Sequence, residues 1–437
     1  MSSPFLKDIL DNLTKRGKSL VDVSRYTNDV VKNLNSLCED LLSMAGEASG
    51  VALAEEVIAV YESMNEKQKR QFFVDLKNQY GVDQQKLGSA VTQYQATPDE
   101  KTALQLNDAS EPKRRELLRR INLAPGGTQT LVAMRVELLS AIADDPSLRI
   151  VDLDFKHLFV SWFNRGFLVM QRIDWNTSAA VLEKIIRYEA VHEIQGWEDL
   201  RRRIDPPDRR CYAFFHPSLE DEPLIFVEVA LTADIPDAIN PLLAQSREPL
   251  DALDATTAVF YSISNCQLGL RGITFGNFLI KQVVGDLKMN LPNLKSFVTL
   301  SPIPRLMSWL KKIPQSEFGN DPALNDIQSK LTEPDWHKDE ALKNRLEKVL
   351  MPLAVKYFLT EKSREKPADP VARFHLGNGA RLNRVNWLAD TSENGLKQSA
   401  GMMVNYLYDV KSITKNHELY AKDHEVVVSN KVRKLLN

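Results

Sequence analysis

The sequence contains little cysteine, no long apolar run and no excess of either charge. Its three cysteines, Cys38, Cys211 and Cys266, are widely separated and form no CxxC pair, so we expect neither a disulfide framework nor a zinc site. No apolar stretch reaches the roughly 18–20 residues that a membrane-spanning helix requires. Lys and Arg number 56 against 58 for Asp and Glu. We therefore expect a protein of the reducing cytosol that has neither a membrane nor a nucleic acid as partner.

The two ends of the sequence carry no recognisable targeting signal. The N-terminal stretch MSSPFLKDIL has no long apolar core and carries charged residues early, so it is not expected to be a signal or transit peptide. The C-terminal stretch VRKLLN differs from the peroxisomal Ser-Lys-Leu signal. Both ends favour a cytoplasmic location.

The first part of the chain has the hydrophobic period of helices. A chain of 437 residues is expected to form two domains. Apolar residues recur at i, i+3 and i+4 within residues 52–76 and 128–142, and Asp145-Pro146 interrupts the pattern. We predict an all-helical oligomerisation bundle over residues 1–147 and a second domain over residues 148–437.

After Pro206-Pro207 the pattern changes to that of strands. β-Branched and aromatic runs bounded by turn residues predict short strands, and a return to helical spacing predicts helices. The fold class is therefore α+β, a helical bundle followed by a mixed α/β domain. The predicted strands are 211–215, 223–231, 257–264 and 295–300, with a β-like stretch over 371–387, and the predicted helical regions are 276–289 and 322–362.

A glycine-rich loop, NCQLGLRGITFGN, occupies residues 265–277 between a predicted strand and a predicted helix. Free N–H groups and the positive end of the helix dipole would make this turn an anion site. Gly269, Gly272 and Gly276 would let a pyrophosphate approach the backbone closely. The loop matches neither a Walker A loop nor the Gly-x-Gly-x-x-Gly fingerprint, so glycines that only cap turns are an alternative of equal weight.

The stretch SFVTLSPIPRLMSWL contains an apolar run that stops at Ser301. Pro302 and Pro304 then prevent the strand from continuing. A serine before proline is often only a turn former. His375, between Phe374 and Leu376, could equally be a histidine of the core. From the residues alone, both the catalytic and the structural interpretations of Ser301 and His375 stay open.

Four stretches of the second half carry a family resemblance: YSISNCQLGLRGITFGNFLIKQVV, TLSPIPRLMSWL, PVARFHLGNGARLNRVNWLAD and GMMVNYLY. Together they resemble malonyl-CoA decarboxylase, and the likeness extends over residues 185–410. The motifs Ser-Pro-Ile-Pro and Phe-His-Leu-x-Asn-Gly-Ala are highly specific to that family. The resemblance implies a helical first half used in self-association. It also implies a second half similar to the GNAT acetyltransferase fold, in which CoA pyrophosphate lies on a strand–loop–helix turn.

The resemblance also implies roles for individual residues. The family's catalytic serine falls on Ser301 and its catalytic histidine on His375, and Tyr408 resembles the supporting tyrosine, with Tyr406 as the alternative. Unlike the animal members, this sequence lacks the Ser-Lys-Leu tail and the mitochondrial presequence, which favours a bacterial cytoplasmic enzyme. The loop expected to hold the CoA phosphates through its backbone comprises Arg271, Gly272, Ile273, Thr274, Phe275, Gly276 and Asn277.

The implied reaction is the decarboxylation of malonyl-CoA to acetyl-CoA and carbon dioxide. The thioester itself accepts the electrons, so no biotin, pyridoxal, metal or other cofactor is expected. The protein must orient the carboxylate, stabilise an enolate oxygen and protonate the α-carbon. Ser301 and His375 suit these tasks, and their division of labour stays open. No acyl-enzyme is required.

Two other functions remain open for the same sequence. One is a GNAT-type acyltransferase that moves an acyl group from CoA to an amine. The other is a binding module that senses malonyl-CoA without turnover, although Ser301 and His375 speak against it. In each case malonyl-CoA or acetyl-CoA is the expected small-molecule partner. A homo-oligomer, a dimer or tetramer, is expected through the helical domain.

The remaining histidines and a basic run are interpreted without a catalytic role. His192 and His216 are interpreted as structural, and His417 and His424 as solvated residues of a polar tail. The run of arginines at residues 201–203 is interpreted as a basic helix end, which could also meet the 3′-phosphate of CoA.

Overall fold

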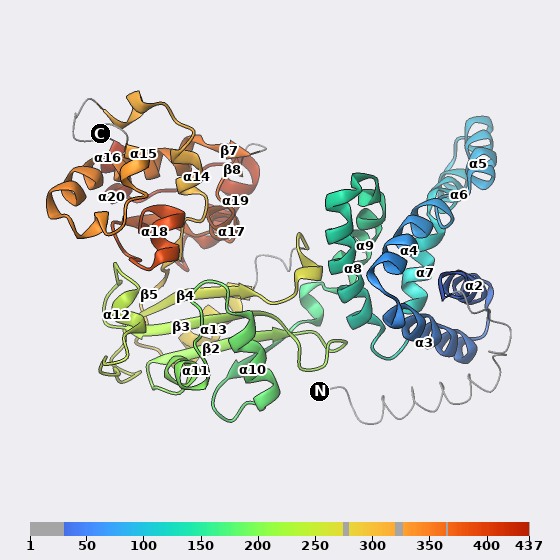
Figure 1. The fold of residues 1–437 in the computed structure, drawn as a ribbon, viewed down its shortest axis with the longest axis horizontal. Helices are drawn as coiled ribbons and strands as arrows, with labels where there is room; N and C mark the ends of the chain where they lie inside the picture. The colour runs from blue at the N-terminus through green and yellow to red at the C-terminus, as the bar shows by residue number, and fades with distance from the viewer. Residues whose placement is uncertain (1–29, 274–278, 320–326, 364–365, 437) are drawn as a thin grey trace. The chain divides into compact units, whose positions relative to one another are not determined.

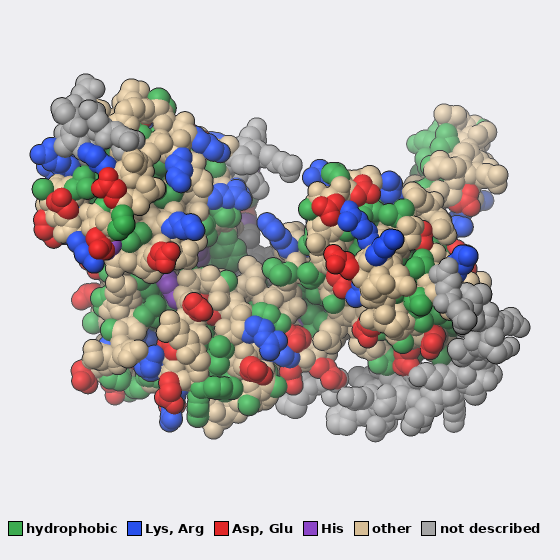
Figure 2. Space-filling view, in the orientation of Figure 1, with side chains coloured by type: hydrophobic (Ala, Val, Ile, Leu, Met, Phe, Trp, Pro, Cys, Tyr) green, Lys and Arg blue, Asp and Glu red, His purple; other side chains and the backbone are tan. Residues whose placement is uncertain are grey.

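The computed structural model describes residues 30–273, 279–319, 327–363 and 366–436 (Figure 1). A helical region is followed by a mixed sheet with helices, so the predicted α+β fold class is confirmed. Within those ranges, no helix combines the length and the apolar character that a membrane crossing demands. On the face shown in Figure 2, acidic and basic side chains are interspersed.

The chain forms two compact units, and the first of them includes two segments from later in the sequence. The boundary predicted at residues 147 and 148 stays a prediction. The first unit comprises Met1–Val169, Phe215–Pro223 and Gln267–Phe275, and the second comprises Met170–Phe214, Leu224–Cys266 and Gly276–Asn437.

The first unit is built from helices that begin at local sequence signals. Asn65 starts α4 through a reciprocal capping box with Gln68, and the Asp83 side chain starts α5 by accepting two backbone N–H groups. The helices predicted from the apolar period in this region are confirmed. Those predictions correspond to α3, α4 and α8. The helices of the first unit are α2 (Val30–Ser43), α3 (Glu47–Ser63), α4 (Glu66–Asn78), α5 (Gln84–Ala96), α6 (Glu100–Ser110), α7 (Lys113–Ile121), α8 (Gly127–Asp144) and α9 (Arg149–Trp162), with the 3₁₀ turns η2 (Pro146–Leu148) and η3 (Arg165–Phe167).

Two buried arginines lie within the apolar core of this helical unit. Arg114 Nε lies 2.5 Å from Asp154 Oδ2, and Arg135 Nε lies 2.8 Å from Asp152 Oδ1. Removing one member of such a pair leaves an uncompensated buried charge. The two pairs therefore help to fix how α7 and α8 pack against α9.

The second unit is built around an eight-stranded sheet in the order β1-β2-β3-β4-β5-β10-β6, with β9 paired to β10. β4 is parallel to β5, whereas β10 is antiparallel to β5, β6 and β9. Between β4 and β5 the chain passes through the glycine loop and α13, so the predicted strand–loop–helix–strand order is confirmed. The strands are β1 (Val169–Ile173), β2 (Arg209–Phe215), β3 (Pro223–Thr232), β4 (Thr257–Asn265), β5 (Ser296–Thr299), β6 (Ser301–Pro302), β9 (Arg381–Asn386) and β10 (Met403–Leu407), with a separate hairpin of β7 (Lys362–Ser363) and β8 (Lys366–Pro367).

Helices of the second unit lie beside this sheet and around the short hairpin. In Figure 1, α14 to α20 are grouped together with β7 and β8. The helices are α10 (Ala179–Tyr188), α11 (Trp197–Ile204), α12 (Asn240–Leu243), α13 (Leu279–Asn290), α14 (Leu306–Leu310), α15 (Ile327–Lys330), α16 (Glu340–Thr360), α17 (Pro370–Gly377), α18 (Glu393–Ser399), α19 (Ile413–Asp423) and α20 (Asn430–Arg433), with 3₁₀ turns η4 (Leu268–Leu270), η5 (Gln315–Phe318), η7 (Trp336–Lys338) and η8 (Lys434–Leu436).

The β-like stretch predicted over residues 371–387 is wrong in its first part. Residues 370–377 form helix α17, and only the later part forms a strand, β9. The Asp369 side chain accepts the N–H groups of Val371 and Ala372, and Pro370 occupies the first turn. An Asp-Pro pair at N-cap and N1 is a helix start signal, and it outweighs the short apolar run that suggested a strand.

Candidate active site

Three of the residues predicted from the sequence to be catalytic form one hydrogen-bonded chain. Ser301 Oγ lies 3.1 Å from His375 Nε2, and His375 Nδ1 lies 2.7 Å from the hydroxyl oxygen of Tyr408. The Ser301 hydroxyl also donates to Thr299 Oγ1 at 2.9 Å. All four side chains are buried. The structure therefore brings together residues that are far apart in the sequence.

Strand alternation determines which side of the sheet Ser301 faces. Side chains two residues apart lie on the same face of a strand, so Thr299 and Ser301 lie together. Val298 and Leu300 lie on the opposite face, within an apolar cluster that includes Met403. The main-chain N–H of Tyr406 donates to Thr299 Oγ1 at 3.1 Å. The hydroxyl partner of Ser301 is thus itself fixed by β10.

His375 lies in the last turn of α17 and contacts both candidate tyrosines. Its ring stacks on Tyr406 with centroids 4.7 Å apart and an interplanar angle of 23°. The Tyr406 hydroxyl has no hydrogen-bond partner within the part of the chain that the structure describes. Tyr408 meets the His375 ring edge-on and supplies the hydroxyl contact. The two tyrosines therefore make different contacts, one through the ring and the other through oxygen.

Burial determines the protonation state of this chain of residues. Desolvation lowers the pKa of His375 to about 3 and raises the pKa of Tyr408 well above its usual value. At neutral pH the imidazole is therefore uncharged, with one donor and one acceptor nitrogen. Since Ser301 donates its own proton to Thr299, His375 Nε2 donates to Ser301 and Nδ1 accepts from Tyr408.

The glycine loop begins after β4 with the short turn η4. Arg271 and Gly272 are exposed and Ile273 is buried. The N–H groups of Arg271 and Ile273 bond to the carbonyls of Leu268 and Leu270, whereas among the described residues no carbonyl accepts the N–H of Gly272. The predicted contacts at Thr274, Phe275, Gly276 and Asn277 lie outside the described residues.

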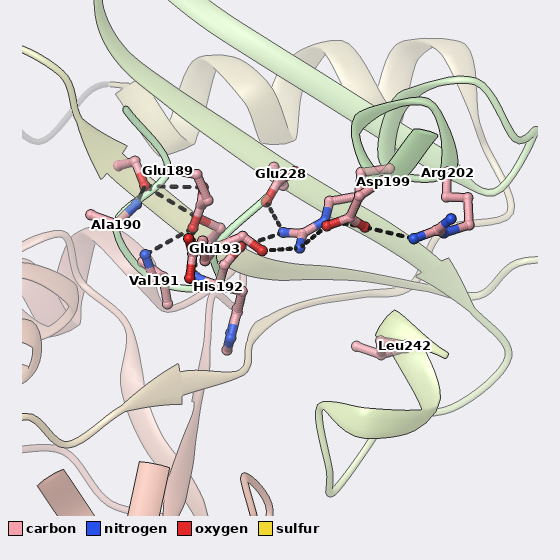
Figure 3. Close-up of polar contacts among 12 residues, drawn as sticks. Glu189, Ala190, Val191, His192, Glu193, Asp199, Arg202, Glu228 and Leu242 are labelled. Carbon is pink, nitrogen blue, oxygen red and sulfur yellow. Dashed lines mark hydrogen bonds and ion pairs between the residues drawn. The ribbon is translucent and has the colours of Figure 1, made fainter. Parts of the chain in front are cut away.

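A buried carboxylate that sequence reasoning missed lies at the end of α10. Glu189 Oε1 accepts the N–H groups of Val191 and His192 at 2.8 and 2.7 Å. The Ser262 hydroxyl donates to both carboxylate oxygens, at 2.8 and 2.7 Å, and Ser264 donates at 3.2 Å. Glu189 therefore ties the turn after α10 to the end of β4 (Figure 3).

Glu228 is a second missed acid, and it lies fully buried within β3. Burial, reinforced by the charge of Glu189, raises the pKa of Glu228 to about 8, so this carboxyl group is largely protonated at neutral pH. Arg203 Nη1 lies 3.5 Å from Oε2 of Glu228. The same guanidinium forms an ion pair with Asp199, in which Nη2 lies 3.0 Å from Oδ2 (Figure 3). A glutamate inside the apolar run PLIFVEVAL was the signal that could have identified this site.

A cavity of about 200 Å³ adjoins the short strand β6, and its lining includes Pro302 and Pro304. His192 contributes to its lining, and the Nε2 atom of this ring is buried without a hydrogen-bond partner in the described structure. Burial lowers the pKa of His192 to about 4, against the charge of Asp390. The lining residues are Ala190, Val191, His192, Pro302, Pro304, Asp390, Asn394, Gly395, Gln398, Ser399, Met402 and Met403.

Comparison with protein families gives matches over both parts of the chain. The model described as "Malonyl-CoA decarboxylase C-terminal domain" matches residues 166–437, and the model described as "Malonyl-CoA decarboxylase N-terminal domain" matches residues 80–163. The mitochondrial malonyl-CoA decarboxylase of Anser anser anser is 38% identical over 347 residues, which is 74% of this chain and 69% of that protein. The Rattus norvegicus protein of the same name is 36% identical over 357 residues, 76% of this chain and 72% of its own length.

Solved structures give similar matches. A malonyl-CoA decarboxylase from Rhodopseudomonas palustris superposes with a TM-score of 0.89 at 54% identity, covering 92% of this chain and 99% of that one. A malonyl-CoA decarboxylase from Agrobacterium vitis superposes with a TM-score of 0.88 at 53% identity, with the same coverage of 92% and 99%.

Proposed function

Because the chain belongs to the malonyl-CoA decarboxylase family, we propose that it is a carboxy-lyase that converts malonyl-CoA to acetyl-CoA and carbon dioxide. The observation that carries the proposal beyond family membership is the hydrogen-bonded chain of Ser301, His375 and Tyr408. It supplies a hydroxyl donor and a titratable group side by side. These are the two groups that the reaction requires.

The reaction breaks the bond between the α-carbon and the carboxylate carbon of the malonyl group. The electron pair of that bond moves into the thioester, which becomes an enolate, and carbon dioxide leaves. In our proposal the Ser301 hydroxyl turns from Thr299 to donate to the enolate oxygen, which stabilises the charge that develops there. The α-carbon then takes one proton, which completes acetyl-CoA.

We assign that proton to His375. Burial is the cause of its lowered pKa, so the arrival of a malonyl carboxylate against the ring would raise the pKa again. Its position in the last turn of α17 also favours a positive charge. The ring would take up this proton from the solvent when the substrate binds, and the imidazolium would then donate from Nε2 to the α-carbon while Nδ1 donates to the Tyr408 oxygen. Tyr408 can serve as acceptor or donor because its hydroxyl has both capacities.

For the glycine loop we propose a role in holding the CoA phosphates. Of its described residues, Gly272 supports this role best, since its N–H is not used by a backbone carbonyl of the described chain. Arg271 supports it with an exposed positive side chain. The further predicted contacts, from Thr274 to Asn277, belong to the same proposal.

We propose that the protein is a homo-oligomer through its helical unit. Three large apolar side chains, Ile150, Leu153 and Val160, are exposed along one stripe of α9, at spacings that place them on one helix face. Such a stripe is typical of an interaction surface. Light scattering coupled to size-exclusion chromatography tests the oligomeric state directly.

We also propose a cytoplasmic location. The support comes from cysteine usage, since Cys38, Cys211 and Cys266 are buried and form no disulfide, as is usual in reducing compartments. Fractionation of the source cells, with the protein detected by antibody, tests this proposal. Recovery from an oxidising compartment would contradict it.

The test of the reaction is turnover of malonyl-CoA as the sole reactant. The purified protein is incubated without biotin, ATP, added metal or an amine, and acetyl-CoA is followed by chromatography. Acetyl-CoA formed in equal amount to the malonyl-CoA consumed supports the proposal. Malonyl-CoA that binds but persists would refute decarboxylation and leave an acyltransferase or a binding module.

A further inference from the structure

One guanidinium of the helical unit holds the glycine loop. Arg135 on α8 is completely buried. Its Nη1 donates to the carbonyl of Gly269 at 2.5 Å, and its Nη2 donates to the carbonyl of Arg271 at 2.9 Å. The remaining donor, Nε, meets Asp152 Oδ1 at 2.8 Å. Arg135 thus links two carbonyls of the loop to a carboxylate on α9.

The loop also touches α8 through its backbone. A Cβ atom on Gly269 would lie 2.0 Å from the carbonyl oxygen of Val132, so no side chain fits at this position. Because this contact is between two backbones, neither partner can move aside easily. The first half of the loop is therefore held against α8 by a close contact as well as by hydrogen bonds.

Lys156 lies one helical turn after Asp152 and reaches the next part of the loop. Its Nζ is 2.6 Å from Asp152 Oδ2, and its side chain is 41% exposed. Its Cε lies 3.9 Å from the place that a Cβ on Gly272 would occupy. Since Arg135 already neutralises Asp152, the cluster keeps a net positive charge. A lysine has three N–H donors, so Lys156 has two left for a ligand.

Gly272 adds the features that an anion needs. Its φ is +81°, a conformation that favours glycine. Its N–H is not accepted by any carbonyl of the described chain. Arg271 next to it is exposed. Two cations, Lys156 and Arg271, therefore lie beside a backbone N–H that no carbonyl of the described residues accepts, which is an arrangement that binds phosphate groups.

We propose that Lys156 binds a phosphate group of the CoA substrate and that Arg135 is a positioning residue for the loop. This proposal rests on the proposed function, because it takes a CoA thioester as the ligand. The pyrophosphate and the 3′-phosphate share the chemistry that Lys156 recognises, and the substrates below distinguish them. The competing interpretation is that Lys156 only forms a surface ion pair with Asp152.

The first experiment replaces the exposed lysine and measures steady-state kinetics with malonyl-CoA. Lys156→Met is expected to raise KM about tenfold with kcat unchanged, as for a lost charge-assisted hydrogen bond. Lys356→Met is the matched control, since Lys356 is 43% exposed and lies 2.7 Å from Glu317. An unchanged KM in Lys156→Met, or an equal rise in the control, would overturn the proposal.

The second experiment shortens the substrate. Malonyl-pantetheine carries no phosphate, so Lys156→Met should turn it over with the same kcat/KM as wild type. With malonyl-dephospho-CoA, loss of the tenfold effect assigns Lys156 to the 3′-phosphate, and its persistence assigns Lys156 to the pyrophosphate. A tenfold effect that persists with malonyl-pantetheine would refute phosphate recognition.

Failure of the proposed reaction can be told apart from failure of this inference. If wild type forms no acetyl-CoA, the same variants are compared by calorimetry with CoA itself. Weaker CoA binding by Lys156→Met than by Lys356→Met would still support the phosphate site. Equal binding by both variants would refute it.

The positioning role of Arg135 has its own readout. Arg135→Lys keeps a positive charge near Asp152 but lacks the planar fork that reaches two carbonyls. It should raise KM for malonyl-CoA and leave kcat/KM for malonyl-pantetheine unchanged. A merely structural role would instead reduce turnover of both substrates to the same extent.

Discussion

Ser301 Oγ lies 3.1 Å from His375 Nε2 across 74 residues of sequence. The serine begins the short strand β6, which continues through Pro302 and pairs with β10, and the histidine lies in the last turn of α17. Neither group carries a charge at neutral pH, because burial lowers the pKa of His375 to about 3. The pair is therefore uncharged until a charged ligand binds.

Removing either member of this pair should abolish most turnover. Ser301→Ala and His375→Ala are each expected to lower kcat by about two orders of magnitude or more, as for a lost oxyanion donor or proton donor. The rate of acetyl-CoA formation measures this. His417→Ala is the control, because His417 Nδ1 contacts the main-chain carbonyl of Gly377 at 2.8 Å and is not part of the hydrogen-bonded chain of Ser301, His375 and Tyr408. Wild-type rates in Ser301→Ala or His375→Ala would overturn the assignment.

The two tyrosines beside His375 should respond differently to loss of their hydroxyls. Tyr408→Phe removes the partner of His375 Nδ1 and is expected to lower kcat about tenfold, since the ring loses its orienting bond. Tyr406→Phe keeps the stacked ring and removes a hydroxyl that is unpartnered in the described chain. It should leave kcat near that of wild type. The reverse order of effects would show that Tyr406 is the supporting tyrosine.

Acid should destabilise the protein through His375. The unfolded chain protonates this residue near pH 6.5 and the folded protein only near pH 3. Between these values the unfolded state binds more protons, so stability falls as the pH drops, by about 1 kcal/mol per pH unit. Urea unfolding measures the free energy of unfolding at about pH 7 and about pH 5. This free energy should fall less between the two pH values in His375→Gln than in wild type. His192 also has a lowered pKa but is present in both proteins. Equal losses would refute this prediction.

Bulk at the exposed turn of the glycine loop should weaken CoA binding. Gly272→Val adds a side chain where φ is +81° and where no carbonyl of the described chain accepts the backbone N–H, so it should raise the Kd for CoA about tenfold or more. Gly285→Val on α13 is the control, because an added Cβ there meets nothing within 4 Å. Calorimetry with CoA measures both. Unchanged affinity in Gly272→Val would contradict the role of the loop.

A charge within the apolar stripe of α9 should change the oligomeric state. Leu153 is 56% exposed, so Leu153→Glu is expected to leave the fold intact while disrupting association through this face. Light scattering would then give a smaller mass than for wild type. Lys77→Glu is the control for an added negative charge. Lys77 lies on α4, and its side chain donates a hydrogen bond to Ser147. An unchanged mass in Leu153→Glu would place self-association elsewhere.

Local patterns predicted the helical unit and the strands β2, β3, β4 and β5, because period and turn residues act over short distances, but they did not predict β1, β6 or β10. The strands around Phe226, Tyr261 and Val298 follow from β-branched and aromatic runs. Residues 370–377 were misread because a short apolar run has no period of its own, and the Asp369 cap decided the outcome.

The site was predictable only in part, for a physical reason. Strand termination marked Ser301, but nothing local could pair it with His375, and the family resemblance supplied that partner. Glu189 binds hydroxyls on β4, and Arg135 binds carbonyls of the loop. Such long-range hydrogen bonds leave no periodic trace in a sequence.

The contact between Gly269 and Val132 bears on how this protein can be divided. The segments Phe215–Pro223 and Gln267–Phe275 belong to the helical unit although they come much later in the chain. A gene truncated to encode only the second half would leave the glycine loop without the helix on which it rests. The helical half is therefore not a detachable module. If recombination replaced it with the helical half of another protein, the new helices would also have to fit the glycine loop. The helical half and the glycine loop are therefore expected to be inherited together.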